Sequence, residues 1–124
     1  MDELHIWLGT FKGTEDEFHQ SFDLTSFYNS KEGEEFKRCE FCKYLNKNSY
    51  DNDFIGYVYD ENQSQKLLEI LPSEQLKKNV LKFSKENNLT NSNALLYYGD
   101  EWLNSDSLDK EFIGLKYLGT FEWE

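Results

Sequence analysis

The chain has 124 residues, a length typical of one domain that buries a core of useful size. It carries 24 acidic and 13 basic residues, a net charge of −11. This charge disfavours nucleic acid and anionic membranes as partners and suits basic ones, although it also serves solubility alone. The 10 Phe, 8 Tyr and 3 Trp residues are ample for a packed core and argue against a disordered chain.

The sequence also indicates the cellular location of the protein and the number of its domains. No apolar run approaches the roughly 20 residues that span a membrane, and the acidic start at 1–3 is unlike a secretory signal. Two cysteines cannot build a disulfide framework. No linker divides the chain. We therefore expect a cytoplasmic protein with a single domain over residues 1–124.

A similar pentapeptide occurs near both ends of the chain, WLGTF at 7–11 and YLGTF at 117–121. Both copies lie in alternating runs of aromatic and branched residues, which predict strands with apolar side chains on both faces. Glycine weakens a strand, so Gly9 and Gly119 indicate a bulge or a close approach of neighbouring atoms. Chance likeness is the alternative to a meaningful repeat. The residues expected to be structural are Trp7, Gly9, Phe11, Tyr117, Gly119 and Phe121.

The first half of the chain predicts helices separated by polar loops. Thr14 and Glu17 have capping-box spacing and begin a short helix that ends near 21–22. Residues 23–35 are mixed and polar, with a loop expected at 29–33. Residues 34–45 are compatible with an irregular helix, and 46–52 are expected to form a second loop.

The second half alternates strands and helices. We expect strands at 54–59 and 93–99, a brief helix at 65–71, an acidic loop at 100–109 and a closing strand at 112–123. The helix at 74–87 is the clearest, because Leu76, Val80 and Phe83 form one apolar stripe after the N-cap Ser73. The order predicts an α+β fold with about four strands, in a mixed or antiparallel sheet with helices packed against it.

Cys39 and Cys42 have the spacing of a redox dithiol or of half a zinc site. Zinc needs about four ligands, and His5 and His19, the only histidines, do not form a second ligand pair. A redox dithiol of this type is expected at the start of a helix directly after a strand, and no strand is evident before Cys39. We interpret the cysteines as ordinary, partly buried thiols.

Other chemistry lacks the residues that it requires. The acidic runs beginning at 51 and 104 resemble calcium loops, but Ile55 and Leu108 stand where an oxygen ligand is needed. No Ser, His and Asp combination and no Gly-rich phosphate loop is evident. We therefore expect no catalytic residues, no metal and no cofactor, and predict that the protein is not an enzyme.

Acidic loops that also carry aromatic side chains are the remaining candidates for function. Such loops suit a basic protein partner, because acids steer the encounter and an exposed aromatic side chain anchors it. The alternative is a solvated rim, with Trp102 folded into the core. The predicted partner-binding residues are Tyr50, Asp51, Asp53, Asp100, Glu101, Trp102, Asp106 and Asp109.

Three segments together resemble the immunity protein 22 family of bacterial polymorphic toxin systems. They are IWLGTF at 6–11, YDNDFI at 50–55 and KYLGTFEW at 116–123, in this order along the chain. The resemblance spans nearly the whole sequence, although 23–48 offers little to match and Gly56 stands where the family pattern tends to have an acid.

The resemblance implies an α+β fold with a characteristic tryptophan, which falls on Trp7. It also implies a non-catalytic inhibitor that binds and neutralises a cognate toxin domain, and the net charge is consistent with a basic toxin such as a nuclease. Alternative interpretations are an acidic nucleic-acid mimic or another protein-interaction module, and a thiol redox protein that uses Cys39 and Cys42. Nucleic acid and membranes are not expected as partners.

Overall fold

The structure is a computed structural model that describes residues 3–31, 37–47, 49–50, 53–60, 64–100 and 103–122. The chain divides into two compact units. The larger unit combines Met1–Lys12 with Asp51–Glu124, and the smaller one is Gly13–Tyr50. None of the helices in the described ranges has the length and apolar character needed to cross a bilayer.

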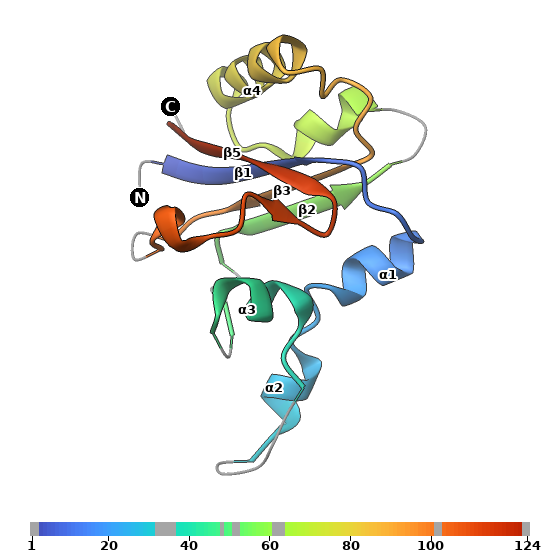
Figure 1. Cartoon of the computed structure of the whole chain (residues 1–124), viewed down its shortest axis with the longest axis vertical. Helices are drawn as coiled ribbons and strands as arrows, with labels where there is room; N and C mark the ends of the chain where they lie inside the picture. The colour runs from blue at the N-terminus through green and yellow to red at the C-terminus, as the bar shows by residue number, and fades with distance from the viewer. Residues whose placement is uncertain are drawn as a thin grey trace. The chain divides into compact units, whose positions relative to one another are not determined.

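The described part of the larger unit contains a five-stranded antiparallel sheet in the order β2-β3-β1-β5-β4 (Figure 1). The α+β class is confirmed, but five strands replace the predicted four or so, and every pair is antiparallel. The strands are β1 (Glu3–Gly9), β2 (Ile55–Tyr59), β3 (Ala94–Tyr98), β4 (Glu111–Phe112) and β5 (Leu115–Glu122).

One face of this sheet packs against helix α4 (Glu74–Glu86) and the 3-10 helix η1 (Ser64–Ile70), which lie together in Figure 1. Leu4, Ile6 and Leu8 of β1 alternate onto this face and meet Leu76 and Val80 of α4 in one buried cluster. The predicted stripe of α4 is therefore confirmed. The opposite face of β1 carries His5 and Trp7, also buried, so β1 is a central strand with apolar surface on both sides.

The two similar pentapeptides are neighbours in the sheet, where Trp7 lies opposite Tyr117. The pairing shifts between Ile6 and Trp7, and Gly119 at this irregularity has a φ of 105° that side chains rarely adopt. At Gly9 a Cβ would lie 2.6 Å from the Gly114 carbonyl oxygen. The predictions of a bulge and of a close approach are both confirmed.

The C-terminal segment is a hairpin and not the single strand predicted for 112–123. Its two-residue turn at Ile113 and Gly114 has positive φ at both positions, which is the geometry that matches the twist of paired strands. The sequence concealed this turn because isoleucine is an unusual residue at a positive φ. The short strand β4 was missed for the same reason.

The smaller unit contains α1 (Glu15–Gln20), α2 (Thr25–Asn29) and α3 (Glu40–Leu45). The capping box of Thr14 and Glu17 is confirmed. Helix α2 was not predicted, and it ends at Asn29, the first residue of the loop expected at 29–33. The Asp23 carboxylate supports its first turn by accepting a hydrogen bond of 2.8 Å from the Thr25 backbone N–H. The helix is too short for its apolar residues to form a periodic pattern that would indicate it. Helix α3 begins later than the irregular helix expected from residue 34.

An aromatic cluster forms the core of the smaller unit. Phe18 and Phe22 of neighbouring turns meet edge to face, with ring centroids 5.3 Å apart, and Phe22 contacts Phe41 at 5.6 Å. The Phe41 backbone N–H donates to the Ser21 carbonyl at 3.0 Å, which ties α3 to the end of α1. All three phenylalanines are buried, so aromatic packing joins α1 to α3 within this unit.

Candidate functional site

Four acidic residues lie on or just beyond four adjacent strands at one end of the sheet. Glu3 of β1 pairs directly with Glu122 of β5. His5 lies opposite Tyr98, and Tyr98 lies opposite Ile55. Asp100 follows Tyr98 by two residues and Asp53 precedes Ile55 by two, so both lie just beyond the paired strands at the same end of the sheet. We call Glu3, Asp53, Asp100 and Glu122 the acidic row. With strands about 4.8 Å apart, it extends over roughly 14 Å.

Asp53 and Asp100 come from loops that are far apart in the sequence, and both were predicted to bind a partner. The Gly99 backbone N–H donates to the Phe54 carbonyl at 2.8 Å, so the two aspartates flank one interstrand hydrogen bond. Asp53 is exposed and Asp100 is half-buried. The sheet thus brings together one residue from each of the two predicted clusters.

Sequence reasoning missed Glu3 and Glu122, although their strands were predicted. Both carboxylates are exposed, and like charges directly opposite each other destabilise a strand pair. The likeness of the two end segments does not fix their register, so no local signal placed these two acids opposite each other. Their juxtaposition contributes nothing to folding and therefore favours a role outside the fold.

His5 lies two residues along β1 from the acidic row and is only 7% exposed. Burial lowers the pKa of His5, while the nearby Asp100 and Glu3 partly offset the shift. The His5 Nδ1 is 2.8 Å from the Tyr117 hydroxyl, and the two rings stack with centroids 6.0 Å apart. The structure therefore favours a neutral imidazole that is held by the sheet.

Tyr117 links the acidic end of the sheet to its aromatic interior. Its ring centroid lies 5.0 Å from that of Trp7, which is fully buried. The Lys110 Nζ lies 5.3 Å from the Tyr117 ring centroid, within the range of a cation–π contact. The half-buried ring of Tyr117 thus separates the core from the charged surface.

Asp106 and Asp109 lie in the loop that contains the 3-10 helix η2 (Ser105–Ser107), at the end of the sheet where β1 begins (Figure 1). Both are exposed. The Asp109 carboxylate accepts a hydrogen bond from the Glu111 backbone N–H at 3.1 Å, and buried Leu108 anchors the loop. Asp109 therefore supports the start of β4 in addition to its predicted role.

Of the remaining predicted partner-binding residues, the structure describes Tyr50 alone. Tyr50 belongs to the smaller unit, where its hydroxyl donates to the Phe22 carbonyl and its ring meets Phe41 edge to face at 5.3 Å. Asp51, Glu101 and Trp102 lie outside the described residues. Whether these four contact a partner stays a prediction.

The residues predicted to be structural have defined contacts. Phe11 is clamped by Asn93, whose side-chain oxygen accepts from the Phe11 N–H at 2.8 Å and whose amide donates to the Phe11 carbonyl at 3.1 Å. Phe121 packs on the buried cluster and meets Phe83 of α4 edge to face. The sequence did not indicate this role of Asn93, because Asn93 and Phe11 are 82 residues apart along the chain.

Helix α4 has the opposite electrostatic character to the acidic row. It carries four lysines against two glutamates, so the acidic excess of the chain lies entirely outside it. Beside α4 is a cavity of about 250 Å³, lined by Leu8, Leu68, Leu81, Ser84, Lys85, Leu89, Thr90, Asn91 and Ser92. The hydroxyls of Ser84 and Ser92 donate to backbone carbonyls at 2.8 and 2.6 Å, so neither is poised as a nucleophile.

Within the described ranges no three His, Cys, Asp or Glu side chains converge to hold a metal ion. His19 is exposed and lies 3.6 Å from Glu15 one helical turn away, as expected for a surface residue. The chemistry that the described surface supports best is electrostatic recognition by the acidic row, which would attract cationic side chains of a partner.

Comparisons with known proteins give one match. The family model of immunity protein 22 matches residues 4–124, which is nearly the whole chain. A search of curated proteins and a search of solved structures each found no match. The resemblance drawn from the three sequence segments is thereby confirmed. The chain belongs to the immunity protein 22 family.

Proposed function

We propose that this protein binds a cognate bacterial toxin domain and neutralises it by occlusion, without catalysing a reaction. Membership of the immunity protein 22 family supports a toxin partner. We place the protein in the cytoplasm of the toxin-producing cell, where an inhibitor meets newly made toxin. The toxin domain is basic, such as a nuclease, because an acidic surface of this kind selects a cationic partner.

The acidic row is the observation that carries this proposal. Glu3 and Glu122 are paired across two strands, with Asp53 and Asp100 at the same end of the sheet. Repulsion among these carboxylates opposes folding and is relieved when lysine or arginine side chains of a partner lie between them. Glu3 and Glu122 stand on paired strands, so their spacing is set before the partner arrives and little ordering of these two residues accompanies binding.

The first experiment tests neutralisation of a toxin. The toxin domain encoded by the gene next to this one is expressed in a bacterial host with and without this protein. Rescue of growth together with a stable complex of the two purified proteins is the expected result. A host that dies in both cases, although both proteins are made and folded, would contradict the proposal.

The second experiment tests the surface. Replacing both Glu3 and Glu122 with Gln removes two negative charges from the acidic row, and we expect at least a roughly 10-fold loss of toxin affinity. Since the replacement also relieves repulsion, the thermal midpoint stays the same or rises. The matched control replaces the exposed Glu69 and Glu86, on η1 and α4, with Gln and removes the same charge elsewhere.

Calorimetry or surface plasmon resonance measures both variants against the same toxin preparation. Equal affinities for the two double variants would show that total charge matters and the acidic row does not. An affinity loss accompanied by a lower thermal midpoint would point to damage of the fold instead of loss of a contact.

A further inference from the structure

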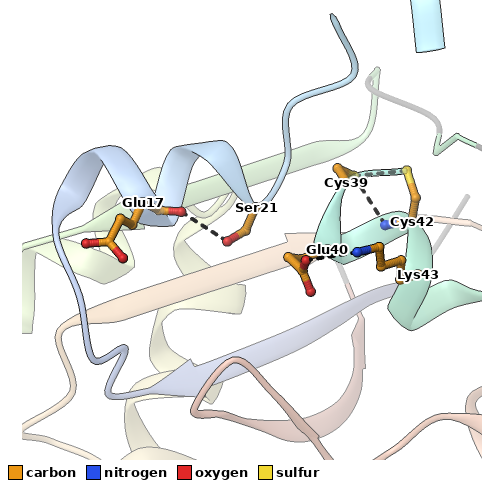
Figure 2. A network of polar contacts seen from close by, with 6 residues as sticks. All are labelled: Glu17, Ser21, Cys39, Glu40, Cys42 and Lys43. Carbon is orange, nitrogen blue, oxygen red and sulfur yellow. Dashed lines mark hydrogen bonds and ion pairs between the residues drawn. The ribbon is translucent and has the colours of Figure 1, made fainter. Parts of the chain in front are cut away.

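The two cysteines lie at the start of α3, where their side chains face each other (Figure 2). The Cys39 and Cys42 thiols share a hydrogen bond, and the two Sγ atoms are 2.9 Å apart. Both side chains are free thiols. A disulfide bond is about 2.05 Å long, so the sulfurs need to approach each other by only about 0.9 Å to be joined.

The backbone holds the pair in this position. Cys39 is the N-cap residue of α3, and its sulfur accepts a hydrogen bond of 3.2 Å from the Cys42 backbone N–H. The neighbouring residues Glu40 and Lys43 form an ion pair of 3.3 Å on the outside of the same turn (Figure 2). The first turn of α3 therefore places the two sulfurs in contact without an added ligand.

The two thiols differ in their access to solvent. Cys39 is 8% exposed, whereas Cys42 is fully buried. Burial and the hydrogen bond that the Cys42 thiol shares with the Cys39 sulfur raise the pKa of Cys42 to about 12, so Cys42 is almost entirely protonated at neutral pH. Thiolate is the nucleophilic form of cysteine, and Cys39 is thus the sulfur that a small oxidant reaches first.

We propose that Cys39 and Cys42 are a thiol-oxidation site, which a low-molecular-weight disulfide closes into an intramolecular disulfide. The Cys39 thiolate attacks one sulfur of the small disulfide, forms a mixed disulfide and expels one small thiolate. Cys42 then loses its proton and attacks the Cys39 sulfur, which releases the second small thiol. The protein gives up two electrons and two protons, and the small disulfide is reduced to two thiols.

The closed form has a more constrained first turn in α3. The covalent bond replaces the contact between the two sulfurs and limits the freedom of the unfolded chain around residues 39–42, which raises the thermal midpoint by a few degrees. The proposal does not depend on the toxin-binding role, because it rests on the two sulfurs alone.

Mass spectrometry of the full-length protein tests the proposal. The reduced protein is desalted, incubated with excess glutathione disulfide at about pH 8, unfolded and labelled with a maleimide. We expect the oxidised protein to have lost two hydrogen atoms and to take up no maleimide, and dithiothreitol to restore labelling at both cysteines. Uptake of two maleimide groups after oxidation, or a glutathione adduct that never resolves, would overturn the proposal.

Single variants test the order of the two steps. Cys42→Ser keeps the attacking sulfur and is expected to accumulate the mixed disulfide with glutathione. Cys39→Ser keeps only the buried sulfur and is expected to remain unmodified over the same time. Modification of Cys39→Ser at the rate of Cys42→Ser would refute the assignment of Cys39 as the attacking group, provided that circular dichroism shows both variants folded. The wild-type measurement stands without either variant.

Discussion

At the scale of single residues, His5 couples the stability of the sheet to pH. Its pKa is lowered from 6.5 in the folded protein, chiefly by burial, with Asp100 and Glu3 acting in the opposite direction. The unfolded chain therefore binds a proton more readily than the folded protein does. The stability associated with a neutral His5 is complete above pH 6.5 and is lost as the pH falls from 6.5 through the folded-state pKa.

We expect the free energy of unfolding to decrease in that window, with a slope that approaches about 1.4 kcal/mol per pH unit for a single group. Urea unfolding at several pH values, for the wild type and for His5→Gln, measures the difference between the two slopes. The variant retains the carboxylates that titrate at lower pH, so the difference between the two slopes gives the contribution of His5 alone. Identical slopes would mean that His5 binds protons equally in both states.

Ile113 is a second residue whose backbone conformation lowers the stability of the fold measurably. It has a φ of 48° in the hairpin turn between β4 and β5, a conformation that asparagine adopts far more readily. Ile113→Asn is expected to raise the free energy of unfolding by about 0.5–1 kcal/mol, because it relieves backbone strain. Thermal unfolding gives the measurement. A lower midpoint would show that packing of the half-buried isoleucine side chain outweighs the strain.

At the scale of elements, α4 depends on its N-cap as well as on its buried stripe. The Ser73 side chain accepts a hydrogen bond from the Leu76 backbone N–H at 3.1 Å. Ser73→Ala is expected to cost about 1 kcal/mol of stability, and Ser73→Asp to retain most of it, since aspartate is also a good N-cap. Chemical denaturation of the two variants measures both effects. Equal losses in the two variants would exclude the cap as the cause.

The elements that could be predicted are those with a local signal that is strong by itself. Helix α4 has a clear apolar stripe over 13 residues, and α1 has a capping box. Helix α2 has five residues, too few for a periodic pattern, and is supported by contacts of Asp23 with Thr25. Strand β4 has two residues and is defined only by pairing with β5, which no local pattern can indicate.

At the scale of the whole molecule, the distribution of charge predicts how the protein meets its toxin. Reversing Asp100, Asp106 and Asp109 to Lys is expected to slow association about 10-fold at low salt and to weaken its dependence on ionic strength, because these acids steer a basic partner. Stopped-flow mixing with the toxin domain at several salt concentrations measures both quantities.

The matched control reverses Glu69, Glu74 and Glu86, which are exposed on η1 and α4 and change the net charge by the same amount. We expect a smaller effect from the control, since these positions are on η1 and α4 and not in the acidic loops. If both triple variants associate equally slowly, net charge alone sets the rate and the location of the acids is unimportant.

The sequence by itself determined the α+β class, the strand character of both ends and the family resemblance, and it indicated a bulge or a close approach at Gly9 and Gly119. These properties are encoded locally, by side-chain alternation, helix caps and glycine positions in short segments. It also indicated Asp53 and Asp100 as separate candidates, but it could not show that they lie at the same end of one sheet.

Only the tertiary structure decided the strand order, the antiparallel pairing of the two similar segments and the resulting acidic row. Glu3 and Glu122 lie opposite each other because β1 pairs with β5, and Asp53 and Asp100 join them through β2 and β3. The physical reason is that register is a relation between distant strands, set by which faces bury their side chains together. The hydrophobic pattern selects the buried faces, and the acids at the strand ends are aligned as a consequence.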